Sequence, residues 1–216
     1  KSTYLDGLKR EVVDGFVHPI FNLNLVETYR SSAQLVNIQN QPTRDDKIGA
    51  MVRRCFIPRE GRVLVEADYG SLEFIICACA YLDPTMLEYA ADPKKDIHRD
   101  SASDIFGLPR RDVSRKLRYE AKSHFVFPQL YGSYYVECAK NIWESIEGLQ
   151  TESGELIFDA LRRQGIRKLG ARDPRLPPQP DTFESRVKEA EVRFYGRFST
   201  LKQKMRDWWS AYQQTG

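Results

Sequence analysis

A long succession of helical patterns, preceded by a single strand candidate, is the feature that most constrains the fold of this chain. Apolar residues recur at helical spacing from Ser71 almost to the end, and Arg62–Ala67 reads as the one extended apolar strand before them. Residues 1–50, dense in Asn, Gln and Ser, indicate short strands and turns. One strand followed by many helices predicts an α+β chain that is predominantly helical.

Capping residues set the expected bounds of these helices. Asp83 and Pro84 start one helix, Gly107 ends another, and Pro109 and Asp112 mark the start of the strongest pattern. The segment "ARDPRLPPQPD" reads as an exposed loop. The expected helices cover residues 71–81, 83–92, about 96–106, 108–127, about 134–147, 151–165 and 182–214, the last as one helix or two with a break near Gly196.

The composition is that of an ordinary globular protein. The chain has 216 residues, enough for one large domain or two small ones, with 41% hydrophobic and 29% charged residues. No apolar run approaches the roughly 20 residues that a membrane-spanning helix needs, and "FIICACAYL" predicts a buried helix instead. No signal peptide is visible, and a first residue of Lys1 rather than Met indicates a fragment.

The four cysteines show no spacing typical of a metal site. Cys77 and Cys79 are two residues apart in an apolar segment, and no second Cys or His pair completes a zinc pattern. We therefore interpret Cys55, Cys77, Cys79 and Cys138 as reduced core residues of an intracellular protein.

Positive charge is concentrated in two short stretches although the net charge is only +3. The stretch nearer the C-terminus, the second of the two, is "LRRQGIRKLGAR" at residues 161–172. Such clusters suit a polyanion, either a nucleic acid or a nucleotide, and a solvated helix face is the plainer alternative. The first stretch contains Arg110, Arg111, Arg115, Lys116, Arg118 and Lys122.

Within the first stretch, Arg118 and Lys122 are spaced to project from one helix face. Two stacked cations repel each other unless an anion lies between them, and a triphosphate suits an Arg fork beside a Lys point charge. The same face becomes aromatic toward Phe127 and Tyr131, as expected if phosphates bind at one end and a base or sugar at the other. A basic surface helix over core aromatics is the alternative.

Asp68 ends the strand candidate with a carboxylate. At the end of a strand it can face a cleft, and with the backbone carbonyl of Tyr69 it offers the oxygen ligands that Mg²⁺ prefers. Capping of the next helix explains Asp68 equally well.

Several segments in fixed order resemble the family A, or polymerase I type, DNA polymerases. "ADYGSLE" at 67–73 is similar to the motif A of that family, and "DIH" at 96–98 with "RYEAKSHFVFPQLYG" at 118–132 is similar to its finger helix. "KSTY", "TYRSSAQLVNIQNQPTR" and "VRRCFIP" resemble the palm segments before motif A. The form "FVFPQLYGSYY" suggests a phage-like branch. Together these blocks cover roughly residues 1–145.

The resemblance implies fingers joined to the first part of a palm, and it implies roles for motif A. Asp68 would bind two catalytic Mg²⁺ ions, or Mn²⁺ in their place, with help from the Tyr69 carbonyl. Glu73 would be the steric gate that excludes ribonucleotides, supported by Tyr131. Ser71, grouped with the nucleotide-binding residues, stands where Gln is usual, which puts one contact with DNA or one that supports the gate in doubt.

The finger helix would bind the incoming deoxynucleoside triphosphate (dNTP). Arg118, Lys122 and His98 would hold the triphosphate, and an aromatic residue would stack on the nucleotide. Between Lys122 and Tyr131 there is one residue more than usual, so counting from Lys122 selects Val126, whereas alignment of "FPQLYG" selects Phe127. We prefer Phe127, with a local bulge that absorbs the extra residue.

The resemblance also implies contacts with primer–template DNA, through phosphates and the degenerate acceptors of the minor groove. The residues concerned are Arg30, Asn37, Gln39, Asn40, Arg44, Arg53 and Gly132.

One expected part is missing from the sequence. The family places its second catalytic Asp in a late His-Asp-Glu motif, and no such tripeptide occurs in this chain. We therefore expect a complementary polymerase chain or segment to supply that Asp. Residues 150–183 have no clear counterpart in the family. The expected subdomains are a partial palm at 1–82 and fingers at 83–216, with an insert near 150–183.

The implied function is template-directed DNA synthesis, the transfer of dNMP to a primer 3′-hydroxyl, in the cytoplasm of a bacterial or phage-infected cell. This chain is expected to be inactive alone. The alternative is a non-catalytic nucleic-acid-binding module that keeps the fold and has lost the chemistry. Retention of Asp68, Glu73, Arg118 and Lys122 favours the enzyme, because a pure binder needs no gate carboxylate.

Overall fold

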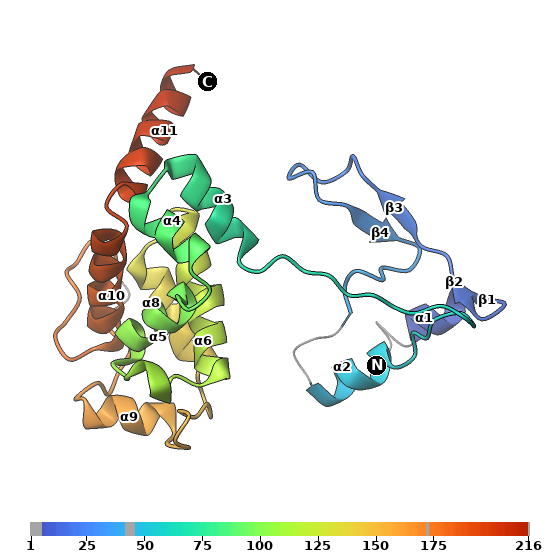
Figure 1. Cartoon of the computed structure of the whole chain (residues 1–216). Helices are drawn as coiled ribbons and strands as arrows, with labels where there is room; N and C mark the ends of the chain where they lie inside the picture. The colour runs from blue at the N-terminus through green and yellow to red at the C-terminus, as the bar shows by residue number, and fades with distance from the viewer. Residues whose placement is uncertain (1–5, 42–45, 172, 216) are drawn as a thin grey trace. The chain divides into compact units, whose positions relative to one another are not determined.

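The computed structural model describes residues 6–41, 46–171 and 173–215, and the chain forms two compact units that divide between Asp68 and Tyr69 (Figure 1). The first unit contains short strands and helices, and the second is helical. The compact units therefore divide earlier than the subdomains predicted at 1–82 and 83–216, because the helix after Tyr69 packs with the helices that follow it. The assignment of palm and fingers stays a prediction.

The first unit is built from two antiparallel strand pairs. Val13 pairs with Phe16 across an Asp14-Gly15 turn in which both residues have positive φ, the turn chemistry that a two-residue hairpin requires. The predicted short strands are confirmed within 12–34, whereas the helix α2 was not foreseen. The elements of the first unit are α1 (Gly7–Arg10), β1 (Val12–Val13), β2 (Phe16–Val17), β3 (Ile20–Asn22), β4 (Ser32–Gln34) and α2 (Asp46–Arg53).

The prediction that Arg62–Ala67 forms a β-strand is wrong. These residues run without regular structure, and the side chains of Val63, Leu64 and Val65 are 80%, 68% and 84% exposed. A strand is stabilised by hydrogen bonds to a neighbour, and in the described part of the chain no strand pairs with this segment. The apolar pattern alone could not show whether a partner strand is present.

The second unit is a helical bundle. The predicted starts at Asp83 and Asp96 and the end at Gly107 are confirmed by capping geometry. Its elements are α3 (Leu72–Tyr81), α4 (Pro84–Ala91), α5 (Ile97–Phe106), η2 (Arg110–Asp112), α6 (Arg115–Ala121), η3 (Lys122–Val126), α7 (Phe127–Leu130), α8 (Tyr135–Ser145), α9 (Ile157–Arg163), α10 (Phe183–Arg197) and α11 (Leu201–Thr215).

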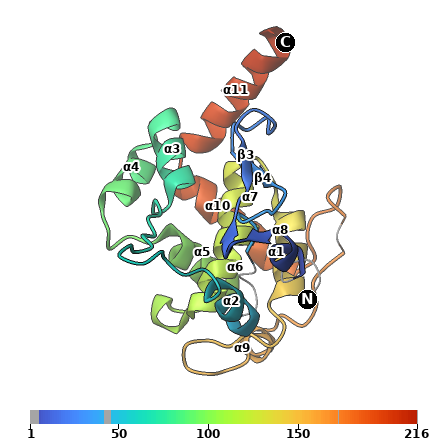
Figure 2. The ribbon, with the colours of Figure 1, turned by 90° about the vertical axis from the view of Figure 1, so that its right-hand side faces the viewer.

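The core of the bundle forms where α10 runs along α5 and α8 (Figures 1 and 2). Phe194 of α10 packs edge-on against Phe125, and Phe106 stacks on Phe183 at the far end of α10. All four rings are buried. This packing fixes the inner side of the segment that carries Arg118 and Lys122, and it leaves the opposite side of that segment for solvent or ligand.

Two predictions about the helices need correction, and one is confirmed. The strongest pattern does not begin at Pro109, because η2 forms a separate turn and Ser114 caps α6 by accepting the N–H of Leu117. The last pattern forms two helices that separate at residues 198–200, which confirms the alternative of two helices with a break near Gly196. The segment "FIICACAYL" is only half buried, because α3 packs through Phe74 and Ala78 while Ile76 is exposed.

The cysteines are free, in line with their predicted reduced state, but two of them are not core residues. Cys138 is buried and Cys77 is half-buried, whereas Cys55 and Cys79 are exposed. Within the described ranges, no helix combines the length and the apolar character needed to cross a membrane.

Candidate functional site

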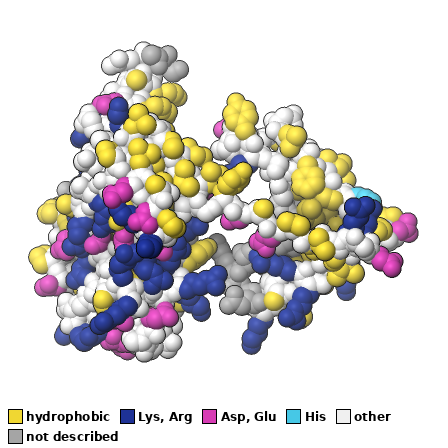
Figure 3. Space-filling model, viewed as in Figure 1, with side chains coloured by type: hydrophobic (Ala, Val, Ile, Leu, Met, Phe, Trp, Pro, Cys, Tyr) yellow, Lys and Arg dark blue, Asp and Glu magenta, His cyan; other side chains and the backbone are white. Residues whose placement is uncertain are grey.

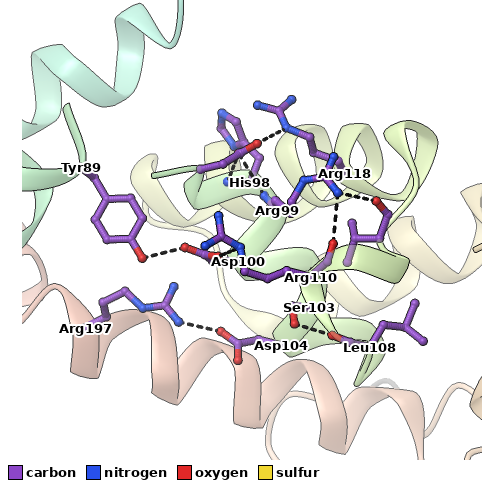
Figure 4. Close-up of polar contacts among 12 residues, drawn as sticks. Tyr89, His98, Arg99, Asp100, Ser103, Asp104, Leu108, Arg110, Arg118 and Arg197 are labelled. Atoms are coloured by element: carbon purple, nitrogen blue, oxygen red, sulfur yellow. Dashed lines mark hydrogen bonds and ion pairs between the residues drawn. The ribbon is translucent and has the colours of Figure 1, made fainter. Parts of the chain in front are cut away.

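Arg118 and Lys122 stand at the C-terminal end of α6, and Arg118 already has an anionic partner. Its guanidinium Nε lies 2.6 Å from Oδ2 of Asp96 (Figure 4). The other oxygen, Oδ1, accepts the backbone N–H groups of His98 and Arg99 and so caps α5. Burial alone would raise the pKa of Asp96, but the hydrogen bond from Arg118 and that from the Arg99 backbone lower it below its usual value.

Asp96 is a site residue that sequence reasoning did not identify as a partner of Arg118. A cap at the start of α5 was predictable from Asp96 itself. Its second oxygen, however, bonds a side chain 22 residues away, and such a contact depends on how α5 packs against α6. The carboxylate therefore joins the helix of Arg118 to the helix that begins beside His98.

His98 is buried at 1% exposure, and its ring meets the edge of the Phe127 ring at a centroid distance of 5.9 Å. Burial, reinforced by the charge of Arg118, lowers its pKa to about 4 against the opposing effect of Asp96, and Lys122 lowers it further. The imidazole is therefore neutral at physiological pH. Neither ring nitrogen has a hydrogen-bond partner among the described residues, which makes His98 a candidate for ligand contact.

A π-helical turn at Lys122–Val126 follows α6, which confirms the predicted local bulge. The backbone N–H of Phe127 donates to the carbonyl of Lys122, five residues earlier. This wider turn brings Phe127 back to the face of Lys122, whose Nζ lies 5.2 Å from the Phe127 ring centroid. Val126 is fully buried in the core, so the geometry favours Phe127 over Val126 as the residue of this face.

The turn after α7 carries Tyr131, which is 72% exposed, and Gly132, whose φ is +84°. Beneath this turn, Gln129 is fully buried. The backbone carbonyl of Gln129 accepts the Tyr195 hydroxyl at 3.2 Å, and its side-chain amide donates to Glu191 at 3.4 Å. Both partners belong to α10, so a helix distant in sequence supports the turn.

Glu191 was not foreseen, although it anchors this turn. One carboxylate oxygen accepts the backbone N–H of Tyr135 at 2.9 Å, and the other pairs with Lys188 at 2.6 Å. The N–H of Tyr135 belongs to the first turn of α8, which has no side-chain cap of its own at Tyr134. The motif Glu-Ala-Glu in a helical sequence gave no signal that its second carboxylate is buried.

Ser71 and Glu73 lie at the start of α3. Ser71 is the N-cap residue in a left-handed conformation, and Glu73 is half-buried in the first turn. Burial raises the pKa of the Cys77 thiol, and the charge of Glu73 raises it further. Because α3 contacts α7, Glu73 belongs to the same compact unit as Phe127. The alternative that Asp68 caps this helix is wrong, since Ser71 occupies that position.

A polar network holds α5 in place (Figure 4). Asp100 accepts the Tyr89 hydroxyl at 2.7 Å and pairs with Arg110 at 2.9 Å, while Asp104 pairs with Arg197 at 2.9 Å. Burial, then the hydrogen bond to Asp100, raises the pKa of Tyr89 to about 12. The helix that begins beside His98 is thereby tied to α4, η2 and α10.

Asp68 is exposed at the end of the first unit, and Tyr69 begins the second. The Asp68 carboxylate and the Tyr69 carbonyl have the hard oxygen chemistry that Mg²⁺ prefers. Over the residues described, no group of three or more His, Cys, Asp or Glu side chains is placed to hold a metal. The donors present fit part of a magnesium site, and the set is incomplete.

The predicted DNA-binding residues of the first unit are exposed where the structure describes them, and Arg44 lies outside the described residues. Asn37 accepts the backbone N–H groups of Gln39 and Asn40 through its side-chain oxygen and so shapes the turn after β4. The Gln39 amide donates to Ser31 at 2.8 Å. Arg30 precedes β4, and Arg53 ends α2.

Comparison with known proteins identifies the class. Residues 1–157 match the sequence family described as DNA polymerase family A, and the chain therefore belongs to this family. It is 36% identical over 145 residues to DNA polymerase I of Geobacillus stearothermophilus, a match that covers 66% of this chain and 16% of that protein. It is 34% identical over 161 residues to DNA polymerase I of Pseudomonas aeruginosa, covering 74% and 17%.

The fold has a counterpart among solved structures. The POL domain of Pol1 from M. smegmatis, in complex with DNA primer-template and dNTP, matches with a TM-score of 0.52 at 23% identity. The match covers 87% of this chain and 36% of that one. The predicted family is thus confirmed, as is the mostly helical fold, while the phage-like branch stays a prediction. The chain spans about a sixth of the length of the curated relatives it matches.

Proposed function

We propose that this chain supplies the nucleotide-binding part of a family A DNA polymerase, which transfers dNMP to a primer 3′-hydroxyl under the direction of a template. The observation that carries the proposal is the convergence of four side chains in the helical unit: Arg118, Lys122, His98 and Phe127. A fork-shaped cation, a point cation, a neutral imidazole and an aromatic ring together suit a nucleoside triphosphate.

In this proposal the two cations hold the triphosphate. Arg118 offers phosphate oxygens the N–H groups that Asp96 does not use, since one carboxylate cannot satisfy all five N–H groups of a guanidinium. Lys122 adds a second positive charge one helical turn away. His98, neutral at physiological pH, donates an N–H without adding a third positive charge.

The sugar and base are proposed to lie toward α3 and α7. Phe127 offers a ring for stacking, and Tyr131 lies one turn beyond it. Glu73 would crowd the 2′-position of the sugar and exclude ribonucleotides, with Tyr131 in support. Ser71, in place of the usual Gln, has a shorter side chain at the start of α3. In an active complex, Glu73→Ala is expected to raise ribonucleotide incorporation.

The metal part of the site is shared with a segment that this sequence does not contain. Asp68 and the Tyr69 carbonyl would be two of the ligands, and the second carboxylate would come from the His-Asp-Glu motif of a complementary polymerase chain or segment. Magnesium, when bound, would activate the primer hydroxyl and stabilise the pyrophosphate leaving group. Asp68 without that second carboxylate would not complete the metal site, so we expect no catalysis by this chain alone.

The DNA partner is proposed to contact the first unit. Arg30, Arg44 and Arg53 would bind phosphates, while Asn37, Gln39 and Asn40 would reach minor-groove acceptors. Gly132, next to Tyr131, would allow close approach of the template because it lacks a side chain. A cytoplasm of a bacterial or phage-infected cell, where template and dNTPs are present, fits this activity.

Nucleotide binding tests the proposal without requiring catalysis. Titration of the 216-residue chain with a fluorescent dATP should give an affinity that Lys122→Ala lowers by about tenfold or more, the loss of one charge-assisted contact. Lys202→Ala is the matched control, because Lys202 also lies over an aromatic ring, 4.9 Å from that of Tyr195. Equal affinities for the two variants would refute the triphosphate assignment.

Primer extension separates the enzyme from the alternative. We expect no extension by the chain alone and extension after a polypeptide with the His-Asp-Glu motif is added in Mg²⁺ or Mn²⁺. Nucleotide and DNA binding without extension in either metal would instead support the non-catalytic binding module.

A further inference from the structure

The outward side of α6 carries more positive charge than a triphosphate needs. Arg115 and Lys116 open the helix and are exposed, whereas Leu117 and Ala121 on the inward side are buried. Arg115 lies about 10 Å along the helix from Lys122, given a rise of about 1.5 Å per residue. The cations at the start of α6 are therefore separate from the Arg118–Lys122 pair.

The charges of Arg115 and Lys116 are not neutralised within the described chain. No ion pair is found for either side chain there, although neighbouring cations are paired: Arg110 with Asp100, and Arg118 with Asp96. The nearby carboxylate Glu120 pairs with His124 at 3.3 Å. Figure 3 shows Lys and Arg side chains gathered over the lower part of the helical unit, where α5, α6 and α9 lie in Figure 1.

Two acidic residues adjoin the start of α6. Asp112 precedes the helix in the chain, and the Glu152 backbone N–H donates to the Asp112 carbonyl at 2.9 Å. The positive surface is therefore centred on Arg115 and Lys116 rather than on Arg111, which is adjacent to Asp112.

An aromatic ring adjoins these cations. Tyr119 is one helical turn after Arg115 on the same face, and its side chain is 58% exposed. Exposed aromatic rings beside backbone-binding cations are the usual combination in surfaces that bind single-stranded nucleic acid, where bases stack and phosphates pair. A triphosphate offers no second base for Tyr119, and a duplex keeps its bases stacked on one another.

We propose that Arg115, Lys116 and Tyr119, here named the α6 surface, bind a single-stranded stretch of nucleic acid, such as the unpaired part of a template. Arg115 and Lys116 contact phosphates, and Tyr119 stacks on one base. The inference rests on the chain acting on a template, and its test needs neither nucleotide nor metal. Failure at this surface leaves the nucleotide assignment intact, and failure of the nucleotide titration leaves this surface intact.

Fluorescence anisotropy of the 216-residue chain with labelled dT20, at several salt concentrations, tests the surface. The double variant Arg115→Ala/Lys116→Ala should bind about tenfold more weakly at low salt and reduce the salt slope by about 1.4, about 0.7 for each phosphate contact in a single strand. The control is Arg10→Ala/Arg175→Ala, which removes the same charge from two exposed cations paired with Glu11 and Asp173. An equal loss in the control pair overturns the proposal.

The aromatic contribution is tested separately. Tyr119→Ala should weaken dT20 binding about fivefold or more, while Tyr119→Phe, which keeps the ring, should bind like the parent chain. Circular dichroism establishes that each variant is folded, as expected for changes at exposed positions. Parent-like binding by Tyr119→Ala, or the same loss with a blunt duplex in place of dT20, overturns the stacking role.

Discussion

The Lys122 ammonium lies 5.2 Å from the centroid of the Phe127 ring, although the two residues are five positions apart in the sequence. In a regular α-helix the residue nearest this face would be Val126, four positions after Lys122. The π-helical turn at Lys122–Val126 changes that register and gives Val126 a core position. One extra residue is thus absorbed without moving the aromatic ring away from the cations.

This register predicts opposite effects for two adjacent truncations. Phe127→Ala should weaken dATP binding about tenfold with a small change in stability, because its ring is only partly buried beside Lys122. Val126→Ala should leave affinity nearly unchanged and lower the free energy of unfolding by about 1–3 kcal/mol, since the side chain is fully buried. Nucleotide titration and urea unfolding measure the two quantities. If Val126→Ala weakened dATP binding and Phe127→Ala did not, the nucleotide contact would belong to position 126 instead.

The bulge was predictable because it depends on local spacing between two recognisable motifs. The helix caps Asp83 and Asp96 were predictable for the same reason, since a cap and its N–H donors lie within three residues. The support that Glu191 gives to the Tyr131–Gly132 turn was not predictable, because Glu191 and Tyr135 are 56 residues apart. The prediction of a strand at Arg62–Ala67 was wrong for a related reason: a strand forms only with a partner strand, which can lie at any distance along the same chain or in another chain.

Glu191 provides a test of how the Tyr131–Gly132 turn is held. Glu191→Ala removes the acceptor for the Tyr135 N–H and leaves buried donors unsatisfied, which should cost about 2–3 kcal/mol. Amide hydrogen exchange at Tyr135 should become faster than in the parent chain. Glu189→Ala removes an exposed carboxylate from the same helix and should change neither quantity. Unchanged exchange at Tyr135 in Glu191→Ala would contradict the anchoring role.

His98 predicts a pH dependence of stability. Its pKa is about 4 in the folded chain against an ordinary 6.5, so between these values the unfolded state binds more protons than the folded state. Stability conferred by the neutral imidazole is complete above pH 6.5 and falls, by up to about 3 kcal/mol, as the pH drops toward 4. Arg118 and Lys122 oppose protonation, and Asp96 favours it.

Urea unfolding at several pH values, for the parent chain and His98→Phe, measures this contribution. The difference in unfolding free energy between the two proteins should change by up to about 3 kcal/mol between pH 6.5 and pH 4. The control His18→Gln, at an exposed position, should give the same curve as the parent chain. Parallel curves for His98→Phe and the parent would show that His98 is not held neutral by the fold.

Asp83 joins two helices that are far apart in sequence. Its Oδ1 accepts the backbone N–H groups of Thr85 and Met86 at the start of α4, and its Oδ2 accepts the N–H and hydroxyl of Thr200 just before α11, at 2.9 and 2.7 Å. Burial alone would raise the pKa of Asp83, but the bond from the Thr200 hydroxyl and the backbone N–H bonds lower it. The carboxylate therefore stabilises the fold above the ordinary pKa of Asp, and this stability is lost as pH falls through the folded pKa.

Asp83→Ala should lower the free energy of unfolding by about 2–4 kcal/mol, because it removes a cap from α4 and leaves Thr200 donors unsatisfied. Asp92→Ala is the matched control at the other end of α4, where the carboxylate accepts the Lys94 N–H at an exposed position. Thermal and urea unfolding at pH 7 compare the two variants. Near-equal losses would mean that the Thr200 contact adds nothing, and that α11 is positioned by the packing of Leu201 and Phe198 alone.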